Sequence, residues 1–222
     1  MTHLHHAFNT VSRTIAVAAL CVASSYANAS LITVETGMST ALAQKTGAGY
    51  QAVVEAAIAV KTAGYGAKTV AKFDGLNNRS LFGAAQNIAT KYTVDFLVSE
   101  ANAGSFSFRF GTDFTYGGAV FIDNALVAYN NSDMWWNNTY TVASEIFQFT
   151  SLLNAGTHTI EIFGLEPCCD GIAQGQFKSA KSTVFTTFST TDGMNPAIPE
   201  PSSIALLGLG VAGLLASRKK FG

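Results

Sequence analysis

The strongest constraint on the fold is an alternation of apolar and polar side chains with a period of two residues. In residues 92–98 every second side chain is Tyr, Val or Phe, and in residues 106–110 three Phe alternate with Ser and Arg. Successive side chains of a strand point to opposite faces, so each stretch predicts a strand with one buried face. Residues 101–104 between them are typical of a turn, and we expect the two strands to pair as a hairpin.

Further short strands are predicted downstream, with Gly and Asn in the turns between them. They cover residues 119–122, 125–129, 144–150, 158–164 and 183–189. Between the first two, Asp123 and Asn124 suit the positive φ of a tight hairpin turn. Short strands at this spacing predict a mainly β fold, an antiparallel β-sandwich of the lectin-like jelly-roll type.

One helix is expected before these strands. Residues 51–62 are rich in Ala, and their Val and Ile recur at helical spacing. Gly47 and Gly49 precede this segment, Gly64 and Gly66 follow it, and we expect these glycines to bracket the helix.

The charge balance excludes one class of partner. From residue 30 to residue 200 the chain has nine Lys and Arg against fourteen Asp and Glu, a net charge of −5. A nucleic-acid interface needs a basic face that neutralises phosphates, so we expect no nucleic-acid partner. Few charges and 16 Phe in the whole chain indicate a filled core and a folded module.

The first 29 residues have the pattern of a cleavable signal peptide. Arg13 precedes the apolar residues 15–23, and a small-residue A-x-A site ends at Ala29. We therefore expect cleavage between Ala29 and Ser30 and export of the chain. The mature β-sandwich domain, with its helical segment, is expected to span residues 30–190, about the size of one domain.

The C-terminus combines a Pro-Glu-Pro motif, an apolar stretch from Ile204 to Ala216, and a basic end. The motif and the basic end consist of Pro199, Glu200, Pro201, Arg218, Lys219 and Lys220. Thirteen helical residues rise about 20 Å, short of the roughly 30 Å hydrocarbon core of a bilayer. With the basic end on the cytoplasmic side, this predicts a C-terminal hydrophobic helix that anchors the chain transiently in the inner membrane. An ordinary single-span tail anchor is the alternative.

These C-terminal features, in this order, resemble the PEP-CTERM sorting signal of Gram-negative bacteria. The adjacent Cys168 and Cys169, followed by Asp170 and Gly171, also resemble the CCXG group of PEP-CTERM proteins. The resemblance implies a linker over residues 191–198, a sorting signal over residues 199–222, and an exosortase-type processing enzyme as partner. It also implies a final location at the outer surface or in the extracellular matrix.

Two further segments resemble strand pairs of the protective-antigen-type lectin sandwich. They are residues 117–127 and residues 153–162. Calcium-dependent sugar-binding members of that fold carry two consecutive Asp residues at the metal site, and this chain has no Asp-Asp pair. The calcium and its binding mode are therefore not carried over, and we expect no metal and no other cofactor.

Cys168 and Cys169 are the two cysteines of the expected mature chain. After export they can bond to each other, pair with another molecule, or remain thiols. A tetrahedral zinc site is disfavoured because no cluster of His or Cys accompanies them. Pro167 and Gly171 on either side predict a tight loop, which favours the internal disulfide. Such a ring is a flat, rigid, apolar platform for a sugar or a peptide.

Both tryptophans of the chain lie in one polar loop. The candidate carbohydrate-binding residues of this loop are Asp133, Trp135, Trp136 and Asn137. An indole ring offers a flat apolar face, and neighbouring Asp and Asn side chains bind hydroxyl groups, so the loop suits a sugar ring. The alternative is that one or both rings fill the end of the sandwich, because Trp is mostly buried on average.

We expect no catalytic residue. His158 is the single histidine of the mature chain, but it begins a predicted strand and no nucleophile motif accompanies it. A glycosidase needs two carboxylates about 5 to 10 Å apart. The sequence does not pair the available ones, which are Asp113, Asp123, Asp133, Glu145, Glu161 and Glu166.

The sequence therefore predicts an exported, non-catalytic surface or matrix protein whose partner is an exopolysaccharide or a cell-surface glycan. An extracellular glycan-active hydrolase and a structural coat protein without a ligand are the alternatives.

Overall fold

The structure is a computed structural model, and it describes residues 30–194. The predicted signal peptide, the second half of the predicted linker, the sorting signal and the predicted C-terminal helix lie outside these residues. Within residues 30–194, the structure contains no helix that combines the length and the apolar character needed to cross a membrane.

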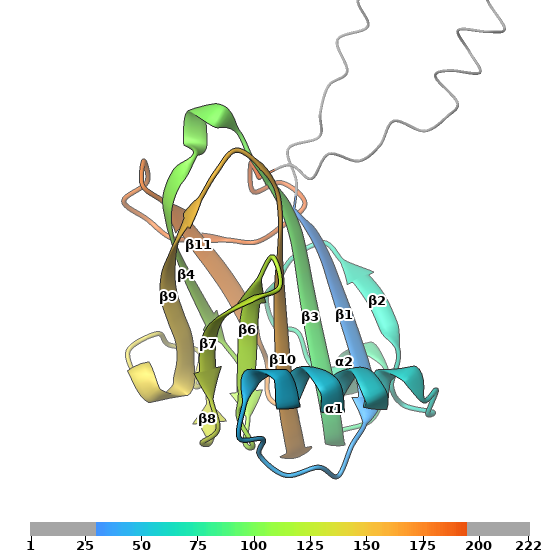
Figure 1. The fold of residues 1–222 in the computed structure, drawn as a ribbon. Helices are drawn as coiled ribbons and strands as arrows, with labels where there is room; N and C mark the ends of the chain where they lie inside the picture. The colour runs from blue at the N-terminus through green and yellow to red at the C-terminus, as the bar shows by residue number, and fades with distance from the viewer. Residues whose placement is uncertain (1–29, 195–222) are drawn as a thin grey trace, which may run out of the picture.

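Two antiparallel sheets face each other and enclose the core (Figure 1). The larger sheet has the strand order β2 (Ala67–Val70), β1 (Leu31–Met38), β3 (Gln86–Val98), β10 (Gly156–Cys168), β6 (Gly118–Ile122), β7 (Ala125–Asn130). The smaller sheet has the order β12 (Thr186–Thr187), β11 (Gln174–Ser179), β4 (Gly104–Gly111), β9 (Ile146–Leu153). A separate ribbon pairs β5 (Asp113–Phe114) with β8 (Met134–Trp135). The predicted antiparallel β-sandwich is thus confirmed.

Aromatic rings from the smaller sheet fill the space between the sheets. Phe106, Phe108 and Phe110 of β4 are fully buried, while Ser107 and Arg109 between them face outward. The Phe108 ring lies 6.3 Å from the ring of Phe96, which projects from β3 of the opposite sheet. The period-two pattern therefore identifies the buried face correctly.

The predicted helix exists and covers the outer face of the larger sheet as α1 (Gly47–Ala59) (Figure 1). It begins earlier than expected because the Thr46 hydroxyl caps it, accepting a 3.0 Å hydrogen bond from the Gly49 amide. Gly47 and Gly49 are accordingly part of its first turn and do not precede the helix. Tyr50 and Val54 face the sheet and are buried.

The predicted hairpin between the strands at residues 92–98 and 106–110 is wrong. Strand β3 pairs with β1 and β10, whereas β4 pairs with β9 and β11 of the other sheet. The turn of 3-10 helix at Glu100–Asn102 carries the chain from one sheet to the other. The alternation cannot distinguish these cases, because both strands direct their apolar face toward one core in either arrangement.

The other predicted elements are confirmed in part. The turn at Asp123 and Asn124 is confirmed, with φ angles of 49° and 67° between β6 and β7. Strands β1, β2, β5, β8 and β11 were not predicted, and the strand expected at residues 183–189 shortens to β12. The remaining helical elements are the four-residue α2 (Asn78–Leu81) and a turn of 3-10 helix at Ala143–Glu145.

Candidate functional site

The β5–β8 ribbon places an acid beside an exposed indole ring. Asp113 lies opposite Trp135, and Phe114 lies opposite Met134. Phe114 and Met134 are buried in the core, so the alternation directs Asp113 and Trp135 to the other face of the ribbon. The Trp135 side chain is left 60% exposed.

The cysteine loop lies at the same end of the molecule. Cys168 ends β10 opposite Gln86, the first residue of β3, and a disulfide joins Cys168 to Cys169. The Cys169 amide donates to the Ala85 carbonyl at 3.1 Å, which ties the loop to the residue before β3. Cys169 itself has φ 84°, so the chain turns sharply after the strand.

A buried acid connects the cysteine loop to β5. Glu166 is 3% exposed, and its carboxylate accepts hydrogen bonds from the Thr115 amide at 2.7 Å and the Cys168 amide at 2.8 Å. The Thr115 hydroxyl donates a third bond at 3.2 Å. Burial raises the pKa of Glu166, and the two amide donors oppose that rise.

Two further carboxylates fix the end of the loop. Asp113 Oδ2 accepts from the Gly171 amide at 2.7 Å, and a Cβ on Gly171 would lie only 2.3 Å from that oxygen, so glycine is required there. The Asp170 carboxylate accepts from the backbone amides of Asn78, at 3.0 Å, and Arg79 in the first turn of α2. Burial raises the pKa values of both acids.

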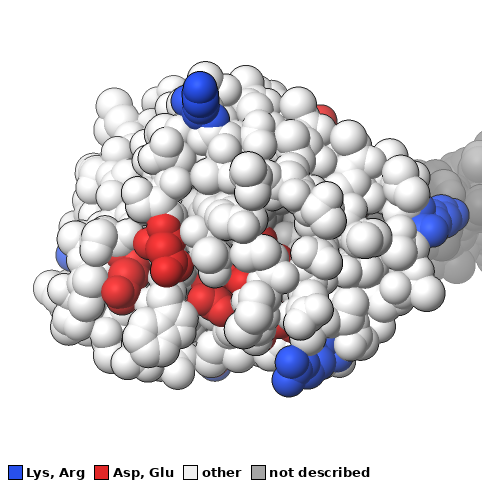
Figure 2. Space-filling view, turned by 90° about the horizontal axis from the view of Figure 1, so that it is seen from below, with Lys and Arg blue, Asp and Glu red and all other residues white. Residues whose placement is uncertain are grey.

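These elements enclose an open hollow of about 280 Å³, which we call the Trp135 hollow. It is lined by Asp113, Thr115, Asp133, Trp135, Cys168 and Cys169. Figure 2 looks onto the end of the molecule at which β8 lies in Figure 1, and it shows acidic side chains gathered there with basic ones at the margins. The indole and the disulfide offer apolar faces, and the carboxylates accept hydrogen bonds, which are the two contacts that a sugar ring needs.

The two remaining residues of the predicted sugar-binding set lie elsewhere. Trp136 is 5% exposed, so the prediction of a surface made by both indoles is wrong. Its ring covers Gly111, where a Cβ would come within 2.2 Å of the ring, and its Nε1–H donates to the Thr139 carbonyl at 2.6 Å. Asn137 is exposed but is not part of the hollow's lining.

Three other titratable residues considered for catalysis, Asp123, His158 and Glu161, are engaged in structural contacts. His158 bonds through Nδ1 to Asp123 at 2.7 Å and through Nε2 to the Asn154 carbonyl at 2.9 Å, so neither ring nitrogen is free. Glu161 forms an ion pair of 2.7 Å with Lys91. Among residues 30–194, no three His, Cys, Asp or Glu side chains converge as a metal site would require.

A larger hollow of about 480 Å³ lies at the opposite end, beside Val98, where β3 finishes. Its lining is partly apolar, with Phe106, Phe177 and Met194 among the contributing residues. The carboxylate in this lining, Asp192, is occupied by hydrogen bonds of 2.9 Å from the Ser189 and Met194 amides. The smaller hollow is the better candidate because its polar groups converge beside exposed apolar faces.

Sequence reasoning identified part of this site. It singled out Asp133, Trp135 and the cysteine pair, but it missed Asp113 and Thr115 as their neighbours. Glu166 was considered only as a catalytic carboxylate. The two-residue β5–β8 pairing that assembles them leaves no periodic signal in the sequence, because two residues are too few to alternate.

The described fold is similar to several lectin-like domains of known structure. The PA14 sugar-binding domain from an RTX adhesin has a TM-score of 0.41 at 12% identity, over 76% of this chain and 99% of that chain. The PA14 domain of the antifreeze protein MpAFP has a TM-score of 0.46 at 13% identity, over 74% and 88%. The Epithelial Adhesin 9 A domain of Candida glabrata, in complex with Galβ1-3GlcNAc, has 0.43 at 10%, over 74% and 88%.

PA14 domains, which two segments of the sequence resemble, are thus among the solved structures with a similar fold. At identities this low, ligand binding has to be argued from the site itself. No curated protein sequence matches the chain. Residues 197–220 match the PEP-CTERM protein-sorting motif, which confirms the sorting signal predicted from the sequence. This motif implies that the chain is exported and reaches the cell surface through an exosortase system.

Proposed function

We propose that this domain is a non-catalytic glycan-binding module that attaches to neutral exopolysaccharide at the cell surface or in the extracellular matrix. The observation that carries the proposal is the convergence of Trp135, the Cys168–Cys169 ring and two carboxylates on one hollow. Export by the sorting motif supports it, because it implies a location where polysaccharide is found. An exosortase-type enzyme is the proposed processing partner, with transient anchoring in the inner membrane on the way.

The chemistry of the hollow favours a neutral sugar over an acidic one. Asp113 and Asp133 line it, and the charges of Asp133 and Asp170 add to the burial that raises the pKa of Asp113. A uronic acid carboxylate would be repelled by these groups, whereas hydroxyl groups can donate to them. Trp135 and the disulfide supply apolar faces on which a pyranose ring can stack.

The volume of the hollow argues for weak binding by single sites. About 280 Å³ is just below the range of about 300 to 1,000 Å³ that is usual for ligand sites, so it accommodates a single sugar unit. We expect a dissociation constant of roughly 1 mM, or about −4 kcal/mol. Many copies displayed on one surface would provide firm attachment to a polymer.

A hydrolase remains the second candidate, favoured by one observation. Asp113 and Asp133 line the same hollow, and burial raises the pKa of Asp113, as a general acid requires. Against it, Asp113 is committed to the Gly171 amide and Glu166 to three hydrogen bonds that hold the loop. We therefore assign these acids no catalytic role, and we expect no release of reducing ends from any glycan that binds.

The test is a calorimetric titration that measures the affinity of the full chain for neutral β-linked glucose and galactose oligosaccharides. Trp135→Ala should abolish binding with little change in thermal stability, because the ring is exposed. Leu152→Ala is the matched control, since Leu152 is 79% exposed on β9, outside the hollow. Unchanged affinity in Trp135→Ala would contradict the proposal, and no binding by the wild type would favour the structural-coat alternative.

A further inference from the structure

The outer face of the smaller sheet carries two cations side by side. Arg109 of β4 lies opposite Gln176 of β11, and Lys178 lies one alternation further along β11, opposite Ser107. Phe108 and Phe177 point into the core, so Arg109, Gln176 and Lys178 project together from the other face. We call this surface, with the rings of Tyr140 and Phe185 that cover it, the Arg109 face.

The Arg109 guanidinium is held between two aromatic rings. Its central carbon lies 4.0 Å from the centroid of Tyr140 and 4.0 Å from that of Phe185. Its Nε donates to Gln176 Oε1 at 2.7 Å, and Nη2 donates to the same oxygen. The orientation of the guanidinium is therefore fixed from three sides.

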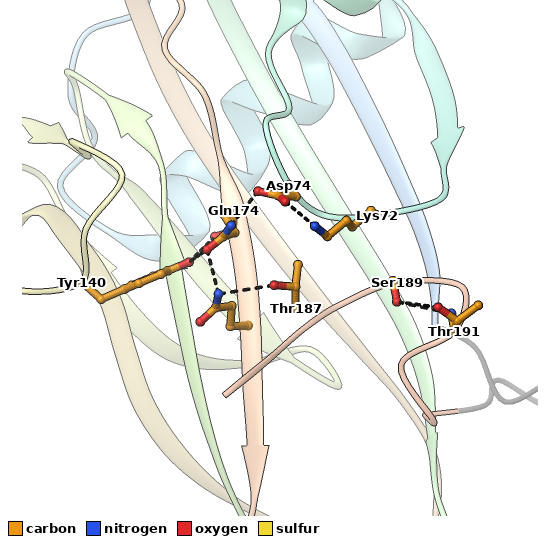
Figure 3. Close-up of polar contacts among 8 residues, drawn as sticks. Lys72, Asp74, Tyr140, Gln174, Thr187, Ser189 and Thr191 are labelled. Carbon is orange, nitrogen blue, oxygen red and sulfur yellow. Dashed lines mark hydrogen bonds and ion pairs between the residues drawn. The ribbon is translucent and has the colours of Figure 1, made fainter. Parts of the chain in front are cut away.

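A chain of polar contacts holds this arrangement in turn. The side-chain amide nitrogen of Gln176, Nε2, donates to Gln174 Oε1 at 2.8 Å, and the Tyr140 hydroxyl donates to the same oxygen at 3.0 Å. Gln174 then donates to Asp74 at 2.6 Å, and Asp74 pairs with Lys72 (Figure 3). The one carboxylate of this network thus pairs with Lys72 through Oδ2 and accepts from Gln174 through Oδ1, and it forms no ion pair with Arg109 or Lys178.

Both cations of the face lack an acidic partner within residues 30–194. The ion pairs of this part of the chain involve Lys72, Lys91 and His158, and none involves Arg109 or Lys178. Lys178 Nζ lies 5.1 Å from the same Phe185 ring that Arg109 contacts. Gln176 Oε1 is the guanidinium's one acceptor among the described residues, which leaves three of its five N–H donors for a ligand.

We propose that the Arg109 face is a second binding site, which takes the carboxylate of a uronic acid unit in an acidic polysaccharide. The planar guanidinium matches a carboxylate with two parallel N–H donors, and the Lys178 ammonium adds a second positive charge. Tyr140 and Phe185 are half-buried, and their rings give the rest of the sugar an apolar contact.

The experiment compares the full chain's affinity for an oligogalacturonate and for its methyl ester, which has the same sugars without the charge. We expect the acid to bind about tenfold more tightly, with a difference that shrinks as salt is added. Lys178→Gln should weaken oligogalacturonate binding about two- to fivefold. Lys68→Gln, the same change at an exposed position of β2 in the other sheet, is the control and should have no effect.

Three results would overturn this assignment. They are equal affinity for acid and ester, equal effects of the two lysine substitutions, and equally tight binding of a sulfated glucan, which would point to charge alone. Because Arg109→Lys keeps the charge but loses the planar fork, it should weaken binding of the acid while its salt dependence persists. The test is independent of the Trp135 hollow, since Trp135→Ala should leave oligogalacturonate affinity unchanged and Lys178→Gln should leave neutral-sugar affinity unchanged.

Discussion

The Trp135 hollow and the Arg109 face both present aromatic rings, but the charged side chains beside those rings have opposite signs. In the hollow, an exposed indole stands beside Asp113 and Asp133, whereas on the face two rings enclose Arg109 beside Lys178. The residues from Trp135 to Tyr140 serve both: the first ring lines the hollow, and the last covers the guanidinium. In both proposals the neighbouring charges, more than the aromatic rings, decide which sugar each surface suits.

Between these two surfaces lies Trp136, and its truncation should have the largest effect. Trp136→Ala removes a buried ring that packs on Gly111 and lies 5.4 Å from Tyr140, so we expect a loss of about 3 to 5 kcal/mol in the free energy of unfolding. Urea denaturation measures it, with Trp135→Ala as the control. Equal losses in both variants would show that the two indoles are not divided between core and surface.

Glu166→Gln should weaken binding at the Trp135 hollow without affecting binding at the Arg109 face. A glutamine side chain cannot accept all the hydrogen bonds that the carboxylate receives from Thr115 and Cys168, so we expect a loss of about 1 to 3 kcal/mol in stability at pH 7. Neutral-sugar binding should weaken with it, while oligogalacturonate binding persists. Glu100→Gln, at an exposed acid, is the control, and a matching loss there would remove the structural role assigned to Glu166.

Replacement of both cysteines by serine should affect the hollow alone. Without the apolar ring we expect neutral-sugar affinity to fall about two- to fivefold, which corresponds to about 0.4 to 1 kcal/mol. Peptide mapping of the unmodified chain should show a mass two hydrogens lower on the Cys168–Cys169 peptide and no free thiol. Covalent dimers that separate on reduction would instead show that the pair links two molecules.

The smallest effect concerns pH. Asp113 and Asp170 have pKa values raised by burial above their ordinary 3.8, so the folded state binds more protons than the unfolded state in that range. The free energy of unfolding should therefore fall as pH rises from about 3.8 through the raised pKa values, and then level off. Asp113→Asn should make the fall shallower. Thermal melts across this range measure it, and a steeper fall in the variant would contradict the assigned direction.

Local patterns predicted strands β3 and β4 but not their partners. The alternation around Phe96 and Phe108 identified both buried faces, yet it could not show that the two strands belong to different sheets. The Asp123–Asn124 turn was predictable because its chemistry is local, since positive φ at both positions favours such residues. Pairing depends on contacts between distant residues, and no periodicity within one strand records them.

The candidate site was predictable only in fragments for the same reason. Trp135 and Trp136 have the same side chain, yet the first is exposed and the second is buried. Trp135 is exposed because the alternation of β8 directs it away from the buried Met134. Trp136 is buried because its ring fills the space above Gly111. That β8 pairs with β5, and that Glu166 ties β5 to the cysteine loop, are facts of tertiary structure. Nothing in the spacing of Asp113 and Cys168 along the chain indicates them.

The most direct test of the two-surface account is one NMR titration of the full chain labelled with nitrogen-15. The chain has two tryptophans, so two indole N–H signals are expected. A neutral oligosaccharide that binds should shift the Trp135 indole signal and leave the Trp136 indole and Arg109 Nε–H signals in place. Oligogalacturonate should shift the Arg109 signal and leave that of Trp135. A shift of the same signals by both ligands would contradict the account, because it would mean that one site binds both sugars.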